Sequence, residues 1–250
     1  MSDQRAWKHL RGVVVDFFGT VARHPQGAVS GLAAVFERHG YSLDPRTEAD
    51  HARRYEGIEH REHSLSADTY EAWIRRRHTE LATADAVSAQ DMTAVVDALM
   101  ALSDSPLVAY PDAAPVLRTL RNRGFRVGVC SNWGWDLESS LRQAGLFDLV
   151  DVAVTSAQAG ARKPHPRIFA VLSEAMSIGP EEILFVGDSL RPDVDGSIAA
   201  GMSAVHLHRP EDASGPAPAL PAGALRVGSL SELLDWEALA APLGAPLAPG

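Results

Sequence analysis

Polar residues that could do chemistry follow three short apolar runs of this sequence. Asp16 follows VVV, Ser131 and Asn132 follow VGVC, and Asp188 follows ILFVG. A single aspartate after a strand is often only the start of a turn or a helix N-cap. The carboxyl ends of parallel strands, however, lie along one edge of a sheet, where ligands bind. Several such residues together therefore indicate one site.

The acidic residues of this group indicate a metal ion. Asp193 lies five residues after Asp188. Bare carboxylates of Asp16, Asp188 and Asp193 would repel one another, so their convergence requires a divalent cation, and an all-oxygen ligand set suits Mg²⁺. Bound Mg²⁺ in turn favours a phosphate-bearing substrate.

Lys163 stands out because lysine is rare in this chain. Only Lys8 and Lys163 are lysines, and the other 21 of the 23 basic residues are arginines. Pro164 after it favours an extended conformation at Lys163. Its ammonium group could neutralise both a nucleophilic carboxylate and incoming phosphoryl oxygens.

The elements that must position these residues alternate between strands and helices. Helices are predicted in PDAAPVLRTLRNRG, ending at Gly124, and in PRIFAVLSEAMSIG, with Pro166 at its first helical position. This alternation predicts an α/β fold, a Rossmann-like doubly wound parallel sheet. The predicted strands are GVVVDF, FRVGVCSN, LVDVAVTS, EEILFVGDS, MSAVHL and ALRVGS.

One long interval interrupts the alternation. Residues 23–107 show only helical periodicity, which is far more chain than a strand crossover needs. We expect an inserted α-helical cap subdomain at 23–107, a core formed by 1–22 and 108–236, and a flexible C-terminal tail at 237–250. Within the insert, the helical segments are 31–40, 46–63, 67–82 and 89–102.

Composition excludes several classes of protein. The net charge of −9 argues against a nucleic-acid binder that uses a general basic surface. There is no apolar run of membrane-spanning length and no signal peptide at the start, so we expect a cytoplasmic protein without a membrane partner. The single Cys130 excludes an intramolecular disulfide and a cysteine-rich zinc site. Oligomeric state is not determined by composition.

Four segments together resemble the haloacid dehalogenase-like hydrolase superfamily. DFFGT is similar to its nucleophile motif, VCSN to its second motif, RKPHP to its lysine motif and VGDSLRPDVDGSIAAGM to its acidic motif, all in family order. The similarity extends over roughly residues 10–22 and 106–230. The helical insert resembles the C1 cap of one subgroup.

The resemblance implies roles for individual residues. Asp16 would be the nucleophile of a covalent aspartyl intermediate, oriented by Lys163, with Ser131 hydrogen-bonded to the transferred group. Asn132 and Thr20 would bind substrate, Thr20 either contacting phosphate or tying down its loop. The implied Mg²⁺ ligands are Asp16, Asp188, Asp193, as a direct or outer ligand, and the backbone carbonyl of Phe18.

Phe18 departs from the family pattern. Family phosphatases usually carry a second aspartate two residues after the nucleophile, where it protonates the leaving alcohol. Any residue supplies the carbonyl, but phenylalanine cannot supply the proton, and such assistance is typically worth about 10²- to 10⁴-fold in rate. A phosphatase would need an activated substrate or a proton donor borrowed from the substrate or the insert. The insert holds six of the ten histidines, including His24.

Two other functions remain open. Family dehalogenases carry an aromatic residue at the position of Phe18 and attack a 2-haloacid through the same aspartate, but they need no metal, so the retained Asp188 argues against this. A catalytically weak or non-enzymatic scaffold is the third possibility, and the retention of the whole polar set argues against it.

The insert would contribute specificity by lying over the strand ends, where a cap excludes water and contacts substrate. Arg61, if it faces the cleft, would favour an anionic substrate. We therefore expect a Mg²⁺-dependent phosphatase that hydrolyses a small phosphorylated metabolite through phospho-Asp16.

Overall fold

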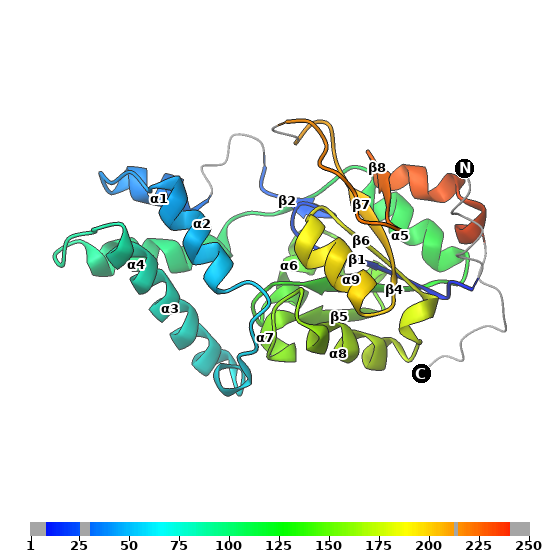
Figure 1. Ribbon diagram of the computed structural model, residues 1–250, viewed down its shortest axis with the longest axis horizontal. Coiled ribbons are helices and arrows are strands. Elements are labelled where there is room, and N and C mark those ends of the chain that lie inside the picture. The colour runs from blue at the N-terminus through cyan, green and yellow to red at the C-terminus, as the bar shows by residue number, and fades with distance from the viewer. Residues whose placement is uncertain (1–8, 26–30, 213–214, 241–250) are drawn as a thin grey trace.

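The computed structural model describes residues 9–25, 31–212 and 215–240, without the side chains of residues 103 and 104. Its centre is a parallel sheet in the order β5-β4-β1-β6-β7-β8 (Figure 1). All six strands predicted from the sequence are present. Their bounds are β1 Gly12–Val15, β4 Arg126–Ser131, β5 Val152–Thr155, β6 Ile183–Gly187, β7 Ser203–Leu207 and β8 Leu225–Val227.

Helices cover both faces of this sheet, so every central strand is buried on both sides. Val13 and Val15 of β1 point into one apolar cluster with α5 (Ala113–Asn122) and α6 (Leu137–Gln143), while Val14 points into another with α8 (Pro166–Met176). This alternation is what a period-2 strand between two helical layers requires. The α/β doubly wound fold is confirmed. The remaining core helices are α7 Ser156–Ala159, α9 Gly196–Ala199, η4 Phe147–Leu149, η5 Pro180–Glu182, η6 Leu190–Asp195 and η7 Leu230–Asp235.

β1 lies at the point where the winding of the sheet reverses. Its neighbours are β4 on one side and β6 on the other, in parallel register, with Val15 opposite Val129 and Val186. Ligands of doubly wound sheets bind in the crevice beyond the carboxyl ends of such strands. The residues that follow β1, β4 and β6 therefore share the crevice.

The long insert is helical, as predicted, and has an apolar core of its own. Figure 1 shows α1 to α4 beside the sheet body and apart from its layers. Val35, Leu81 and Leu99 lie in a cluster formed entirely by insert residues. The insert helices are α1 Leu32–Arg38, α2 Pro45–Arg54, α3 Ala67–Ala84, α4 Met92–Met100 and η3 Ala101–Asp104. Within the described residues, no helix is both long and apolar enough to cross a membrane.

The helix predicted over 46–63 was too long. α2 ends at Arg54, and only the short turn η2 (Arg61–His63) is helical after it. Gly57, three residues after the end of α2, has φ +64°, which a regular helix does not contain. The chain then pairs with the core: Glu59 bridges to Ala161, and Ile58 O accepts from Arg162 N at 3.0 Å. Helical periodicity could not reveal this pairing with a segment a hundred residues away.

A two-stranded ribbon joins the insert to the core and was not predicted. β2 (Ala22–Arg23) pairs antiparallel with β3 (Val108–Ala109). Two residues are too few to show a strand periodicity. The ribbon holds together the two chain segments that enter and leave the insert.

The predicted tail begins too early. Glu237–Leu239 forms the turn η8, and Leu239 is fully buried in the core. Its carbonyl accepts from Arg123 Nη1 at 3.0 Å. The Pro- and Gly-rich end of the predicted tail, 243–250, lies outside the described residues.

Candidate active site

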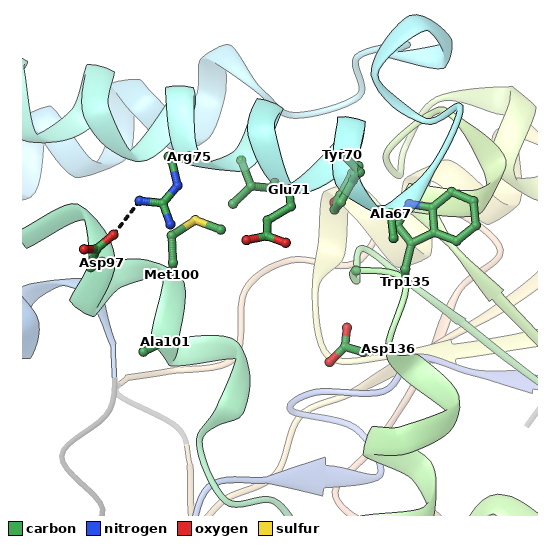
Figure 2. A pocket seen from close by; sticks show the side chains of 11 residues that line it. Ala67, Tyr70, Glu71, Arg75, Asp97, Met100, Ala101, Trp135 and Asp136 are labelled. Atoms are coloured by element: carbon green, nitrogen blue, oxygen red, sulfur yellow. Dashed lines mark hydrogen bonds and ion pairs between the residues drawn. The ribbon is translucent and has the colours of Figure 1, made fainter. Parts of the chain in front are cut away.

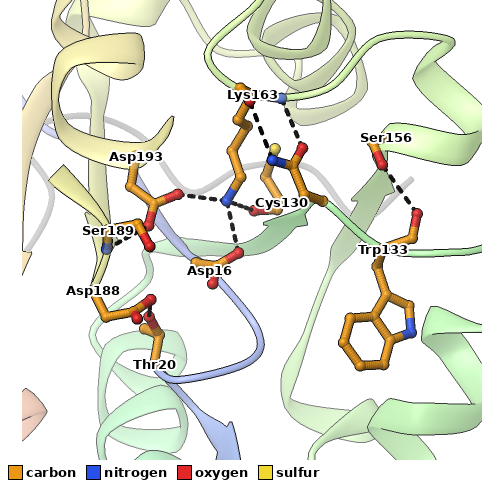
Figure 3. A network of polar contacts seen from close by, with 10 residues as sticks. Asp16, Thr20, Cys130, Trp133, Ser156, Lys163, Asp188, Ser189 and Asp193 are labelled. Carbon is orange, nitrogen blue, oxygen red and sulfur yellow. Dashed lines mark hydrogen bonds and ion pairs between the residues drawn. The ribbon is translucent and has the colours of Figure 1, made fainter. Parts of the chain in front are cut away.

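Lys163 is the centre of a buried polar network beyond the strand ends (Figure 3). Its Nζ donates to Asp16 Oδ1 at 2.6 Å, to Asp193 Oδ1 at 2.6 Å and to the Cys130 carbonyl at 2.9 Å. All three ammonium donors are thus used, in a side chain that is 2% exposed. Burial alone would lower the pKa of Lys163, but the charges of Asp16 and Asp193 outweigh it and raise the pKa above its ordinary value. The lysine is therefore held as a cation.

Asn132 fixes the backbone of Lys163. Its Oδ1 accepts from Lys163 N at 2.7 Å, and its Nδ2 donates to Lys163 O at 3.2 Å. The sequence suggested Asn132 as a substrate-binding residue, whereas these two bonds give it a positioning role. They tie the end of β4 to the loop that carries the lysine.

The nucleophile loop packs directly against Asp188. Thr20 Oγ1 donates to Asp188 Oδ1 at 3.2 Å, which fits the loop-fastening role that was one of two suggested for Thr20. Gly19 has φ +83°, and a Cβ there would lie 2.6 Å from Asp188 Oδ2. Only glycine meets both requirements. The Gly-Thr pair thus brings the β1 loop to the carboxylate after β6.

Asp193 is buried and engaged at both oxygens. Besides the bond from Lys163, its Oδ2 accepts from Ser189 N at 3.0 Å. It lies in η6, a short π-helical segment, and Gly187 leaves space for its carboxylate, since a Cβ at Gly187 would lie 2.3 Å from Oδ2. Wider helical turns of this kind occur frequently at functional sites. Both bonds hold Asp193 next to the lysine.

The carboxylates fit a divalent cation. One oxygen each from Asp16, Asp188 and Asp193 lie within 4.8 Å of one another. Oxygen donors of this kind suit Mg²⁺. Within the described chain, no backbone hydrogen bond to the Phe18 carbonyl is recorded, so that oxygen is free to act as a ligand. Lys163 supplies only one positive charge to the three acids, which leaves the cluster in need of a further cation.

Proton binding by these acids makes the effect of Mg²⁺ dependent on pH. Burial, and then the charge of Asp16, raise the pKa of Asp188 from 3.8 to about 7, and burial raises that of Asp193 to about 6 against the opposing charge of Lys163. Without a metal ion, these two carboxyl groups bind more protons in the folded protein than in the unfolded chain between roughly pH 4 and pH 7, so their own contribution to stability falls as pH rises through that window.

Mg²⁺ binds the deprotonated carboxylates and should reverse this loss. We expect the increase in melting temperature caused by Mg²⁺ to be larger at about pH 7.5 than at about pH 5, measured by scanning calorimetry against a chelator control. An increase of the same size at both pH values would contradict the prediction.

Two predicted substrate contacts have different surroundings. Ser131 ends β4 and is buried, and among the described residues no hydrogen bond of its hydroxyl is recorded, so that group is available to a ligand. Arg61 is exposed on η2, and its side chain pairs with Glu59. The network of Figure 3 does not include Arg61. Its substrate-binding role has no support from this geometry.

The sequence interpretation missed two buried residues that support the site. Arg209 donates from Nη2 to the Thr20 carbonyl at 2.9 Å. Its two Nη atoms also donate to the two carboxylate oxygens of Asp112. His206 donates from Nε2 to the Asp188 carbonyl at 3.0 Å. His206 lies within a predicted strand, and an imidazole among its apolar residues was the one available signal. Nothing near Arg209 in the sequence pointed to Thr20.

A family comparison agrees with this geometry. The model of the haloacid dehalogenase-like hydrolases matches residues 10–201. The chain belongs to this family. The match starts just before β1 and ends after α9, so it covers every member of the polar network and the helical insert. The resemblance of the four motifs is thereby confirmed.

Relatives of this haloacid dehalogenase-like hydrolase include both kinds of enzyme. A phosphatase of Mycobacterium tuberculosis is 40% identical over 102 residues, covering 40% of this chain and 46% of the relative. An (S)-2-haloacid dehalogenase of Burkholderia cepacia is 30% identical over 154 residues, covering 60% and 63%. The chain spans about half the length of the first curated relatives it matches.

Solved structures show the same fold. A hydrolase of this family from Bacillus subtilis, determined with bound magnesium, superimposes with a TM-score of 0.63 at 21% identity. The match covers 91% of this chain and 98% of that one. Similarity of this extent includes the insert as well as the sheet.

Proposed function

We propose that this hydrolase is a Mg²⁺-dependent phosphatase that acts on a small phosphorylated molecule through a phosphoryl group carried by Asp16. The convergence of Asp16, Asp188 and Asp193 around one lysine is the observation that carries the proposal. A magnesium-bound structural relative and a phosphatase among the curated relatives support it. The net charge of −9 suits a small-molecule enzyme, and the free, buried Cys130 suits a cytoplasmic location.

In the proposed reaction, Asp16 attacks phosphorus, and the residues around it orient Asp16 or stabilise the charge of the phosphoryl group. Lys163 holds Asp16 Oδ1, which leaves Oδ2 to attack phosphorus. The hydroxyl of Ser131 is available to a phosphoryl oxygen at the end of the neighbouring strand. Asp16, Asp188 and the Phe18 carbonyl would hold Mg²⁺, which when bound supplies positive charge to the phosphoryl oxygens. Water then releases phosphate and restores the Asp16 carboxylate.

A cavity lies between the insert and the core, beside the segment that follows Ser131 and outside the polar network itself, and we propose it for the organic part of a substrate (Figure 2). It has a volume of 580 Å³ and is lined by α3 and α4 residues on one side and by Gly134, Trp135 and Asp136 on the other. Gly134 follows β4 within three residues of Ser131. This shared lining supports the proposal that residues 23–107 are a cap that contributes to specificity.

Retained acids favour phosphate over haloacid chemistry. Displacement of halide by an aspartate gives a carboxylate ester that water can hydrolyse without a metal ion, so it has no use for Asp188 beside the nucleophile. Two observations favour dehalogenation: the aromatic residue at position 18, and the similarity to the Burkholderia cepacia dehalogenase. A direct comparison of the two reactions separates them.

The test is hydrolysis of p-nitrophenyl phosphate with Mg²⁺ and with a chelator, beside halide release from 2-chloropropionate. We expect phosphate release that depends on Mg²⁺, because nitrophenolate departs without a proton and Phe18 is then no obstacle. Halide release unaffected by the chelator would assign the dehalogenase reaction instead. Failure of both reactions in a folded protein would favour a non-enzymatic scaffold.

A further inference from the structure

Phe18 leaves the proposed reaction without a proton donor two residues after the nucleophile, and its surroundings suggest a substitute. We propose that His24 is the general acid and base of this enzyme. The inference rests on the proposed phosphatase function and adds a catalytic residue to it.

His24 packs directly on Phe18. The two ring centroids are 4.8 Å apart, with a tilt of 58° between the rings. Phe18 is 39% exposed, which is unusual for a large apolar side chain beside buried Asp16, and its ring also stacks with that of Trp133, with 6.3 Å between the centroids. The imidazole is therefore next to the side chain that stands where the missing acid would be.

The backbone around His24 is well fixed. β2 pairs with β3 immediately before it, with Arg23 opposite Val108, and the turn is closed by Gly19 N donating to Ala22 O at 2.8 Å. His24 is thus attached to the nucleophile loop by a short hydrogen-bonded turn. Such attachment gives a catalytic group a defined position relative to Asp16.

Hydrogen bonding decides which ring nitrogen can transfer a proton. His24 Nδ1 lies 3.0 Å from the Pro106 carbonyl. Because a carbonyl only accepts, Nδ1 must carry a hydrogen in both the neutral and the charged ring. Nε2 is then the atom that gains and loses the proton, and among the described residues no partner of Nε2 is recorded.

A second histidine at the site cannot take this role. His206 contacts the Asp188 loop but is 2% exposed, and both of its nitrogens are used: Nε2 donates to the Asp188 carbonyl, and Nδ1 accepts from Arg226 Nε at 3.0 Å. Burial lowers the pKa of His206 and keeps its ring neutral. His24 is partly exposed, and its Nε2 has no partner among the described residues.

The proton transfers balance over one turnover. Asp16 Oδ2 forms a bond to phosphorus while the bond from phosphorus to the leaving oxygen breaks, and that oxygen takes the proton from His24 Nε2. In the second step, Nε2 takes a proton from water as the water oxygen bonds to phosphorus and the bond to Asp16 breaks. The products are the alcohol and phosphate, with Asp16 and His24 returned to their starting states.

The experiment compares phenyl phosphate with p-nitrophenyl phosphate, which differ little in shape but greatly in the basicity of the leaving oxygen. In His24→Asn, the amide can still donate to the Pro106 carbonyl but cannot transfer a proton. We expect kcat/KM for phenyl phosphate to fall by about 10²-fold or more, and that for p-nitrophenyl phosphate to change by less than about fivefold. His39→Asn, in the insert, is the matched control and should change neither value.

A second substitution tests the same idea by rescue. Adding Phe18→Asp to His24→Asn supplies a carboxyl group at the vacant acid position and should restore the hydrolysis of phenyl phosphate. Equal losses for both substrates in His24→Asn would show a structural role and overturn the inference, as would no loss for phenyl phosphate. Wild-type protein that hydrolyses neither substrate would overturn the phosphatase function itself, and this inference with it.

Discussion

Asp16→Asn is expected to abolish the Mg²⁺-dependent hydrolysis of p-nitrophenyl phosphate, with a loss in kcat of roughly 10⁴- to 10⁶-fold, as removal of a covalent nucleophile typically gives. The amide has almost the same volume as the carboxylate but is a very weak nucleophile. The substitution also removes one negative charge from the cluster around Lys163, where Asp193 Oδ1 remains as a partner at 2.6 Å. The folded state should therefore survive the change, and the loss should be chemical.

Mass spectrometry of acid-quenched protein provides the direct measurement. Wild-type protein mixed with substrate should carry a phosphoryl adduct on the peptide that contains Asp16, and the variant should carry none. Asp50→Asn is a matched control, because Asp50 is an exposed aspartate of α2 that pairs with Arg53. It should retain full activity and the adduct. An Asp16→Asn protein that still turns over would remove the proposed nucleophile from the mechanism.

Lys163→Met is expected to destabilise the protein by about 3–5 kcal/mol and to inactivate it, because removing one partner of a buried ion pair leaves the other charge uncompensated. Here two carboxylates lose their partner, since Asp16 and Asp193 both accept from Nζ. The carbonyl of Cys130 loses its donor as well. Urea denaturation monitored by circular dichroism measures the change in unfolding free energy.

A double variant tests whether the loss of stability in Lys163→Met comes from unbalanced buried charge. Lys163→Met with Asp193→Asn removes one buried negative charge together with the positive one, and we expect it to regain a substantial part of the lost stability without regaining activity. Activity stays absent because Asp16 is still not oriented. A single variant as stable as the wild type would show that the lysine does not balance the buried acids.

Local sequence determined the strands and the order of the chemistry-bearing residues. Each apolar run was long enough to show a strand buried on both faces, and the polar residue after each run marked its carboxyl end. The strand order of this sheet brings Asp16 and Asp188 into one crevice, because both follow parallel strands that lie next to each other. The motifs also indicated the family. The roles of these residues in catalysis remain predictions that the variants above test.

Only the tertiary structure decided what pairs with what across long separations. The amide of Asn132 turned out to hold Lys163, 31 residues away, and Arg209 to hold Thr20, 189 residues away. Glu59 pairs with Ala161 within the stretch that was predicted as helix, and Leu239 is buried within the stretch that was predicted as tail. Periodicity and propensity describe the nearest few residues. Contacts between distant segments depend on how the layers pack, so the sequence indicated which groups meet in the crevice but not which neighbours orient them.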